Sequence, residues 1–299
     1  MAWVGYALIS ALAIALVGLL QKRTLQNEHS AEYVMVFSAM KWLMFFSYFR
    51  SSISWSVTST ELLWLVATGL AGAGAFYFLT KSLRRSELSV VAPVLALDPG
   101  LTFLLALVFL GETVQGIQLI GILLLLIGTY VLELRHYPPG WWRDSTKHPG
   151  RIFDPFLQLG KSPGGLFALC ALLSFSLANV IDRHILQSVS IYTYLAYTLS
   201  IMAVFSLIVF VSGRRPVTLF RRHRLTVIPI LLAAGLHLIA NLTQLQAVSL
   251  TAVGLVIALK RLSSLVDVLL GGKFFHEHNL PQKVLASVIM LVGVYFVVQ

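Results

Sequence analysis

The sequence predicts an all-α integral membrane protein with ten transmembrane helices, built as two inverted repeats of five. Three observations predict this fold class. The chain of 299 residues is 58% hydrophobic and 11% charged, with a mean hydropathy of +0.84, which excludes an ordinary water-soluble domain. Its apolar stretches are as long as a bilayer-crossing helix, which needs about 20 residues. In addition, a residue pattern near the end of the first half recurs in the second half.

The apolar stretches form two sets of five, separated by a polar connector over residues 136–163. The connector carries prolines and two adjacent tryptophans, a residue type that favours the membrane interface. It divides the chain into a first repeat, residues 1–135, and a second repeat, residues 164–299. The predicted helices span residues 3–20, 33–50, 61–80, 88–110 and 115–134, and then 164–186, 191–212, 226–246, 249–271 and 281–298.

A shift of 165 residues aligns the ends of the two repeats without a gap. Because each repeat has an odd number of helices, the second enters the membrane from the opposite side, which makes the repeat inverted. Inverted repeats place substrate sites near the midplane of the membrane. The shift pairs Phe109 with Phe274, Glu112 with Glu277, Gly128 with Gly293, and Tyr130 with Tyr295.

The formal net charge of +10 follows from the loops and does not require a nucleic-acid partner. Most Lys and Arg residues lie in the loops after the odd-numbered helices, for example residues 81–85 and 221–224. Since short cytoplasmic loops are enriched in basic residues, this distribution places both termini outside. The first apolar stretch is as long as a membrane span and has no basic n-region, so we expect no cleaved signal peptide.

Lys260 and Arg261 lie side by side in the middle of an apolar stretch. A charged side chain near the bilayer centre costs about 3 kcal/mol and usually lines an internal pathway. Arginine offers a planar fork of donors that suits a carboxylate or phosphate, and lysine adds a point charge. The pair therefore predicts an anion site. The alternative is that Lys260 and Asp267, two helical turns apart, neutralise each other.

Other polar residues within the predicted helices extend this candidate site. Asp98 precedes Pro99 and Gly100, and a proline inside a membrane helix permits a break or kink. Asp98 is thus a candidate proton carrier or a salt-bridge partner of the basic pair. Polar residues also serve as hydrogen-bonding contacts between helices, and Lys41 can snorkel, so structural roles stay open. The predicted substrate-binding residues are Lys260, Arg261, Ser264, His237, Asn241, Asn179 and Lys41, with Asp98 and Asp267 as coupling or salt-bridge residues.

The turn before the last helix of each repeat carries a glutamate, and glycines follow in the closing helices. On these residues the chain resembles the EamA-like, two-repeat, ten-helix branch of the drug/metabolite transporter superfamily. The resemblance implies a multi-pass transporter in a bacterial plasma membrane. It also implies cytoplasmic termini, opposite to the orientation that the charges favour. The motifs are Gly111-Glu112-Thr113 and His276-Glu277-His278, with Gly121, Gly128 and Gly293.

The segment from Ala258 to Ser264 resembles a second group within the superfamily. Its basic pair is similar to the one with which plastid phosphate translocators hold substrate phosphate. This resemblance implies a phosphate-bearing substrate for Lys260 and Arg261.

These observations favour a secondary active transporter that moves a small organic anion, bearing a phosphate or carboxylate, by alternating access. The chain has no P-loop, so the driving force is expected from protons or a counter-substrate. The alternative is an exporter of neutral or zwitterionic amino acids or of amphipathic drugs, with the basic pair held by Asp98 or Asp267.

Two non-transport classes are disfavoured. A membrane enzyme that uses a metal needs clustered carboxylates, whereas the five aspartates are scattered; a scaffold needs a larger soluble surface. The single cysteine, Cys170, offers no disulfide framework or metal motif. We therefore expect no catalytic residue, metal or cofactor, and partners limited to the substrate, the bilayer and a coupled species. The sequence does not specify the substrate, the transport direction or the oligomeric state.

Overall fold

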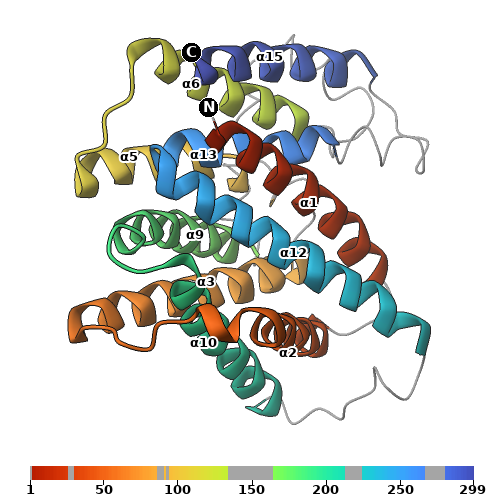
Figure 1. The fold of residues 1–299 in the computed structure, drawn as a ribbon. Coiled ribbons are helices and arrows are strands. Elements are labelled where there is room, and N and C mark those ends of the chain that lie inside the picture. Colours follow the sequence, from red (N-terminus) through yellow and green to blue (C-terminus); the bar gives the residue numbers. More distant parts are fainter. Residues whose placement is uncertain are drawn as a thin grey trace. The chain divides into compact units, whose positions relative to one another are not determined.

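The computed structural model is all-α in the residues that it describes, which are 2–25, 30–85, 91, 94–133, 164–212, 224–266 and 280–299. These residues form ten α-helices and one short 3-10 helix, without a β-strand among them (Figure 1). Five of the helices are long and apolar enough to cross a membrane, and three shorter ones are also apolar. The predicted fold class is confirmed.

The helices follow the predicted order. Most lie within a few residues of the predicted stretches, and the fourth and ninth differ most. The first repeat holds α1 (Ala2–Leu25), α2 (Ser30–Phe49), the 3-10 helix η1 (Arg50–Ser52), α3 (Ser59–Arg85), α5 (Asp98–Leu110) and α6 (Gly116–Glu133). The second repeat holds α9 (Gly165–Ile185), α10 (Ile191–Ser212), α12 (Arg224–Leu250), α13 (Val253–Lys260) and α15 (Leu280–Val298).

The chain forms two compact units that differ from the two sequence repeats. The first unit contains residues 1–73 and 181–251, and the second contains residues 74–180 and 252–299. Each unit therefore combines helices from both halves of the sequence. The connector, residues 136–163, and the motif at residues 276–278 lie outside the described residues.

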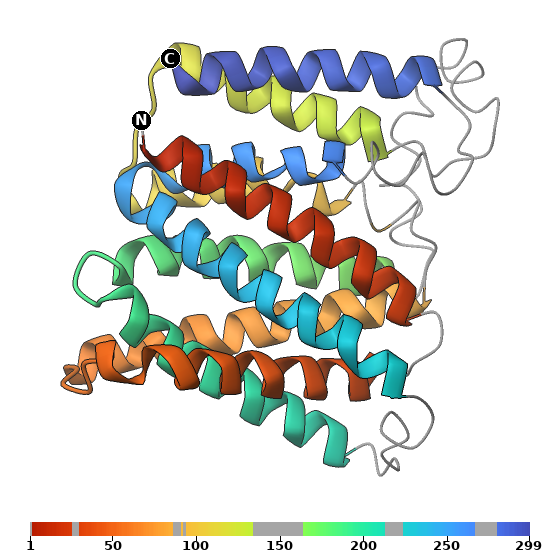
Figure 2. The same cartoon turned by 45° about the vertical axis from the view of Figure 1, so that its right-hand side comes forward.

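In the first unit, α1 lies beside α12, and α2 packs against α10 and α12 (Figures 1 and 2). Side-chain hydrogen bonds join these helices. Ser10 Oγ donates to the Ala240 carbonyl at 3.0 Å, and Trp42 Nε1 donates to Ser200 Oγ at 2.9 Å. Such bonds supplement van der Waals packing, because lipid provides little hydrophobic driving force between membrane helices.

In the second unit, glycines allow α6 and α15 to pack closely (Figure 2). A Cβ atom added to Gly121 would lie 2.7 Å from the backbone nitrogen of Val297. One added to Gly293 would lie 2.9 Å from the backbone nitrogen of Leu125. Small residues let helix backbones approach closely. The glycines of the repeated pattern therefore bring together the closing helices of the two repeats.

The fourth predicted helix, residues 88–110, is broken. A turn at Ala96 and Leu97 precedes α5, and the Leu97 N–H donates to the Val94 carbonyl, three residues earlier, at 3.2 Å. Pro99 lies in the first turn of α5, where its missing N–H costs little and its fixed φ favours helix initiation. The break or kink that the proline permitted is therefore present, as a turn just before α5.

The ninth predicted helix, residues 249–271, is broken at the matching place. The helix α13 ends at Lys260, and Arg261 forms a turn before helical residues 262–266. Here too the bonding is of the 3-10 type, because the Arg261 N–H donates to the Ala258 carbonyl at 3.1 Å. Ala96 and Arg261 are related by the 165-residue shift of the repeat. Such 3-10 interruptions within helices often mark functional hinges.

We expect Gly293→Val to lower the stability of the protein by about 1 to 3 kcal/mol, because the new side chain overpacks the contact between α6 and α15. The midpoint of thermal unfolding in detergent measures this change. Gly116→Ala is the matched control, since a Cβ at Gly116 meets nothing within 4 Å. Equal midpoints for the two variants would contradict the packing role.

Candidate functional site

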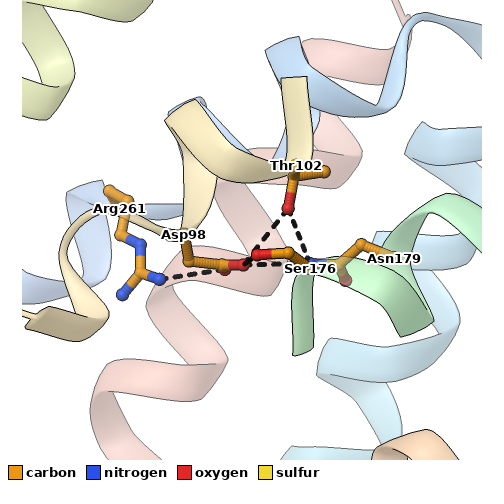
Figure 3. A network of polar contacts seen from close by, with 5 residues as sticks. All are labelled: Asp98, Thr102, Ser176, Asn179 and Arg261. Carbon is orange, nitrogen blue, oxygen red and sulfur yellow. Dashed lines mark hydrogen bonds and ion pairs between the residues drawn. The ribbon is translucent and has the colours of Figure 1, made fainter. Parts of the chain in front are cut away.

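Asp98 lies at the centre of a polar network in the second unit (Figure 3). Its Oδ2 accepts a hydrogen bond from Arg261 Nη2 at 2.9 Å, which is also an ion pair. Its Oδ1 accepts from Ser176 Oγ at 2.8 Å, from Thr102 Oγ1 at 3.2 Å and from Asn179 Nδ2 at 3.5 Å. Asp98 is only 8% exposed, so these donors replace the water that a buried carboxylate loses.

The two helix breaks position the two charged groups of the network. Asp98 is the first residue of α5, and Arg261 directly follows the last residue of α13. A helix carries partial positive charge at its N-terminus and partial negative charge at its C-terminus. Each charged residue therefore lies at the helix end that complements it, and each break supplies that end.

The network combines residues from both sequence repeats. Asp98 and Thr102 lie one turn apart on α5, whereas Ser176 and Asn179 share a face of α9 (Figure 3). Asn179 Nδ2 also lies 3.4 Å from Thr102 Oγ1, which links the two helices a second time. The structure thus brings together Asp98, Asn179 and Arg261 of the predicted set. It adds Ser176, which lies about one turn before Asn179 on α9, and Thr102.

Arg261 uses only part of its hydrogen-bonding capacity in this network. One of its terminal nitrogens contacts Asp98, and its side chain is 23% exposed. A guanidinium has five N–H donors, so further donors are available to a ligand. Lys260 is half-buried beside it, and Ser264 is buried one turn later. Asp267, the predicted partner of Lys260, lies outside the described residues.

Lys41 and His237 form a separate polar pair in the first unit. Lys41 Nζ lies 3.0 Å from His237 Nδ1, between α2 and α12, and Lys41 is only 1% exposed. A hydrogen bond between two nitrogens needs one donor and one acceptor, so a single proton lies between them. The Phe37 ring packs edge-on against the imidazole, with ring centroids 5.3 Å apart. Asn241 is half-buried one turn further along α12.

Glu112 has a structural role. Its Oε2 accepts a hydrogen bond from the Val253 N–H, at 3.0 Å, at the start of α13. Gly111 adopts a left-handed φ of 63° at the end of α5 and turns the chain toward this contact. The glutamate of the first motif therefore caps a helix of the second repeat.

Asp182 was considered in the sequence only as one of five scattered aspartates, and the structure places it in a second carboxylate network. It is 8% exposed and accepts from Thr68 Oγ1 and Tyr194 OH, each at 2.5 Å, within the first unit. The feature of the sequence that could have identified Asp182 is its position as an acidic residue in the last turn of an apolar helix. Its partners come from α3 and α10, which no local pattern identifies.

Within the described part of the chain, no group of three or more His, Cys, Asp or Glu side chains could hold a metal ion. The contacts at Asp98 and Arg261 are an ion pair and hydrogen bonds.

The fold and this site define an integral membrane protein of the two-repeat, ten-helix transporter class. The family model of the EamA-like transporter family matches residues 1–134 and 162–299, and the chain belongs to this family. It is therefore a membrane transporter of the drug/metabolite transporter superfamily, as the sequence motifs predicted.

One solved structure, described only as a crystal structure of a protein, aligns with a TM-score of 0.73. The alignment covers 99% of this chain and 96% of that chain at 15% sequence identity, so it supports the fold alone. A comparison with curated proteins found no match.

We expect His237→Leu to destabilise the protein by about 1 to 3 kcal/mol, because it removes a hydrogen-bond partner of the buried Lys41. His237→Gln keeps a carbonyl acceptor and should lose less. Thermal unfolding in detergent measures both effects. His184→Leu serves as the exposed control. If the two substitutions at His237 shift the midpoint equally, the bond to Lys41 contributes nothing measurable.

Proposed function

We propose that this transporter is a secondary active carrier of a small organic anion, with Arg261 as the principal anion-binding group and Lys260 as a second positive charge. The observation that carries the proposal is the pair of helix breaks at positions related by the internal repeat. Broken helices at corresponding positions of two inverted repeats are typical of transporter binding sites. Here the breaks lie next to Asp98 and at Arg261.

The preference for an anion comes from Arg261. Its planar donor fork can bind a carboxylate or phosphate through two parallel hydrogen bonds, which strengthens the contact and fixes its geometry. One terminal nitrogen contacts Asp98, and the partly exposed side chain leaves further donors for a substrate oxygen. The adjacent Lys260 adds charge to the same region of the chain. Both a carboxylate and a phosphate ester fit this chemistry.

The breaks also suit alternating access. A transporter must expose its site to one side of the membrane and then to the other, and 3-10 turns within helices allow local bending. We propose that bending at the two turns accompanies this change. The proposed driving force is an ion gradient or a counter-substrate. Roles of Lys41, His237 and Asn241 in substrate selection remain predictions.

A second candidate function is export of neutral or zwitterionic amino acids or of amphipathic drugs. The ion pair between Asp98 and Arg261 favours it, because a neutralised arginine can serve the scaffold alone. In that case the network stabilises two broken helices and takes no direct part in substrate binding.

A thermal-shift experiment separates the two candidates, because a ligand that binds the folded state raises the apparent stability. The probes are pyruvate, glycerol 3-phosphate, alanine and tetraphenylphosphonium. The key variant is Asp98→Asn/Arg261→Gln, which removes both charges together and leaves no buried charge unpaired. Arg50→Gln is the control, since Arg50 is exposed and lies in the first unit. We expect at least one of the two anions to stabilise the parent protein and the control, and neither to stabilise the double variant.

The opposite pattern supports the second candidate. Stabilisation by alanine or tetraphenylphosphonium that persists in the double variant, without any effect of the anions, would assign the ion pair to the scaffold.

A further inference from the structure

We propose that Asp98 is the proton-coupling residue of this carrier: an anionic substrate displaces the carboxylate from Arg261, and Asp98 then takes up one proton. This inference rests on the proposed anion site at Arg261 and adds the identity of the coupled ion. It predicts that an anion and a proton bind together.

Charge balance supplies the driving force. The pair of Asp98 and Arg261 has no net charge, and Asp98 is 8% exposed. An anion that binds Arg261 adds one negative charge where little water can solvate it, and Asp98 also loses its counter-ion. Two like charges near one another at low dielectric repel strongly. Protonation of Asp98 restores the original charge, because Arg261 then balances the substrate alone.

The geometry allows Asp98 to exist in either protonation state. Its Oδ2 contacts Arg261 through a single bond at 2.9 Å, so an incoming anion has one bond to replace. Its Oδ1 is held independently by Ser176 and Thr102, whose hydroxyls can donate or accept. These hydroxyls can therefore form hydrogen bonds with Asp98 in both its neutral and its ionised form. Oδ1 accepts hydrogen bonds from three neutral groups, and Oδ2 contacts the cation (Figure 3). The bonds that hold Asp98 in place are therefore separate from the ion pair that balances its charge.

The step balances with one proton and no other reactant. The hydrogen bond from Arg261 Nη2 to Asp98 Oδ2 breaks, substrate oxygen takes its place on the guanidinium, and a proton from water forms an O–H bond at Oδ2. Release of the substrate reverses each change. A full cycle therefore moves one proton with each monovalent anion.

Other titratable groups on the elements around Asp98 do not replace it. In the proposed anion site Lys260 is a second positive charge, so it is not the carboxylate that the substrate displaces. Glu112 lies at the start of α13, where its carboxylate holds the Val253 N–H. The remaining described titratable residues on α6, α9 and α15 within this unit are Tyr130 and Glu133, Cys170, and Lys283 and Tyr295.

The test measures anion affinity and proton uptake together, on purified full-length protein. The probes are pyruvate and dimethyl phosphate, whose single negative charge is constant from about pH 5.5 to about pH 8. Calorimetry in two buffers of different ionisation enthalpy gives the number of protons taken up on binding. For the parent protein we expect about one proton per anion, and a dissociation constant that rises roughly tenfold per pH unit in its steepest range.

Asp98→Asn is the informative variant, because it keeps the shape and removes both the proton site and the competitor for Arg261. We expect it to bind the anion at least about tenfold more tightly near pH 8 than the parent, with no proton uptake and no pH dependence. His184→Gln is the control, because His184 is an exposed histidine of the first unit, and it should take up protons like the parent.

The outcomes separate this inference from the function on which it rests. Anion binding by the parent without proton uptake would overturn the coupling and leave the anion site intact. Proton uptake that persists in Asp98→Asn, or is lost in His184→Gln, would also overturn it, by placing the proton elsewhere. Failure of the parent and Asp98→Asn to bind either anion would count against the anion site itself. The measurement on the parent needs no variant, so it decides the question even if Asp98→Asn does not fold.

Discussion

The need to neutralise a carboxylate within a largely apolar chain is the constraint on which the second unit depends. An isolated buried ion is very costly, and loss of one member of a buried ion pair typically costs about 3 to 5 kcal/mol. Asp98 meets this constraint with Arg261 and with three neutral donors from α5 and α9. The break before α5 and the break after α13 help, because each places a complementary helix end at a charge. The helix ends at the two breaks therefore stabilise the charges, and the ion pair in turn joins the two broken helices.

The second unit shows how two repeats with little retained sequence are held together. The closing helices α6 and α15 approach closely because Gly121 and Gly293 have no side chains. Glu112, at the end of one repeat, caps α13 of the other. Asp98 and Arg261 also come from different repeats. Backbone packing, helix capping and ion pairing thus all act across the repeat boundary, which explains why the compact units do not coincide with the sequence halves.

Three buried polar groups use different chemistry, and this difference suggests different roles. The pair of Asp98 and Arg261 is an ion pair with spare donors on the arginine. The pair of Lys41 and His237 shares one proton between two nitrogens. The network of Asp182 satisfies a carboxylate with the hydroxyls of Thr68 and Tyr194. Of the three, only the first combines a cation suited to an organic anion with a buried carboxylate, and it therefore carries the functional proposals.

The sequence by itself determined the fold class, the ten apolar segments, the two repeats and the family, because hydrophobic length and recurring motifs are local properties of the chain. It also identified Asp98, Asn179 and Arg261 as polar residues in unfavourable surroundings. Only the tertiary structure decided that these three meet, that Thr102 and Ser176 join them, and that Glu112 caps α13. These contacts depend on which helix faces pack together, which periodicity within one segment does not specify. The break at Arg261 was likewise hidden, because no proline or glycine marks it and its side-chain partner lies 163 residues away in the chain.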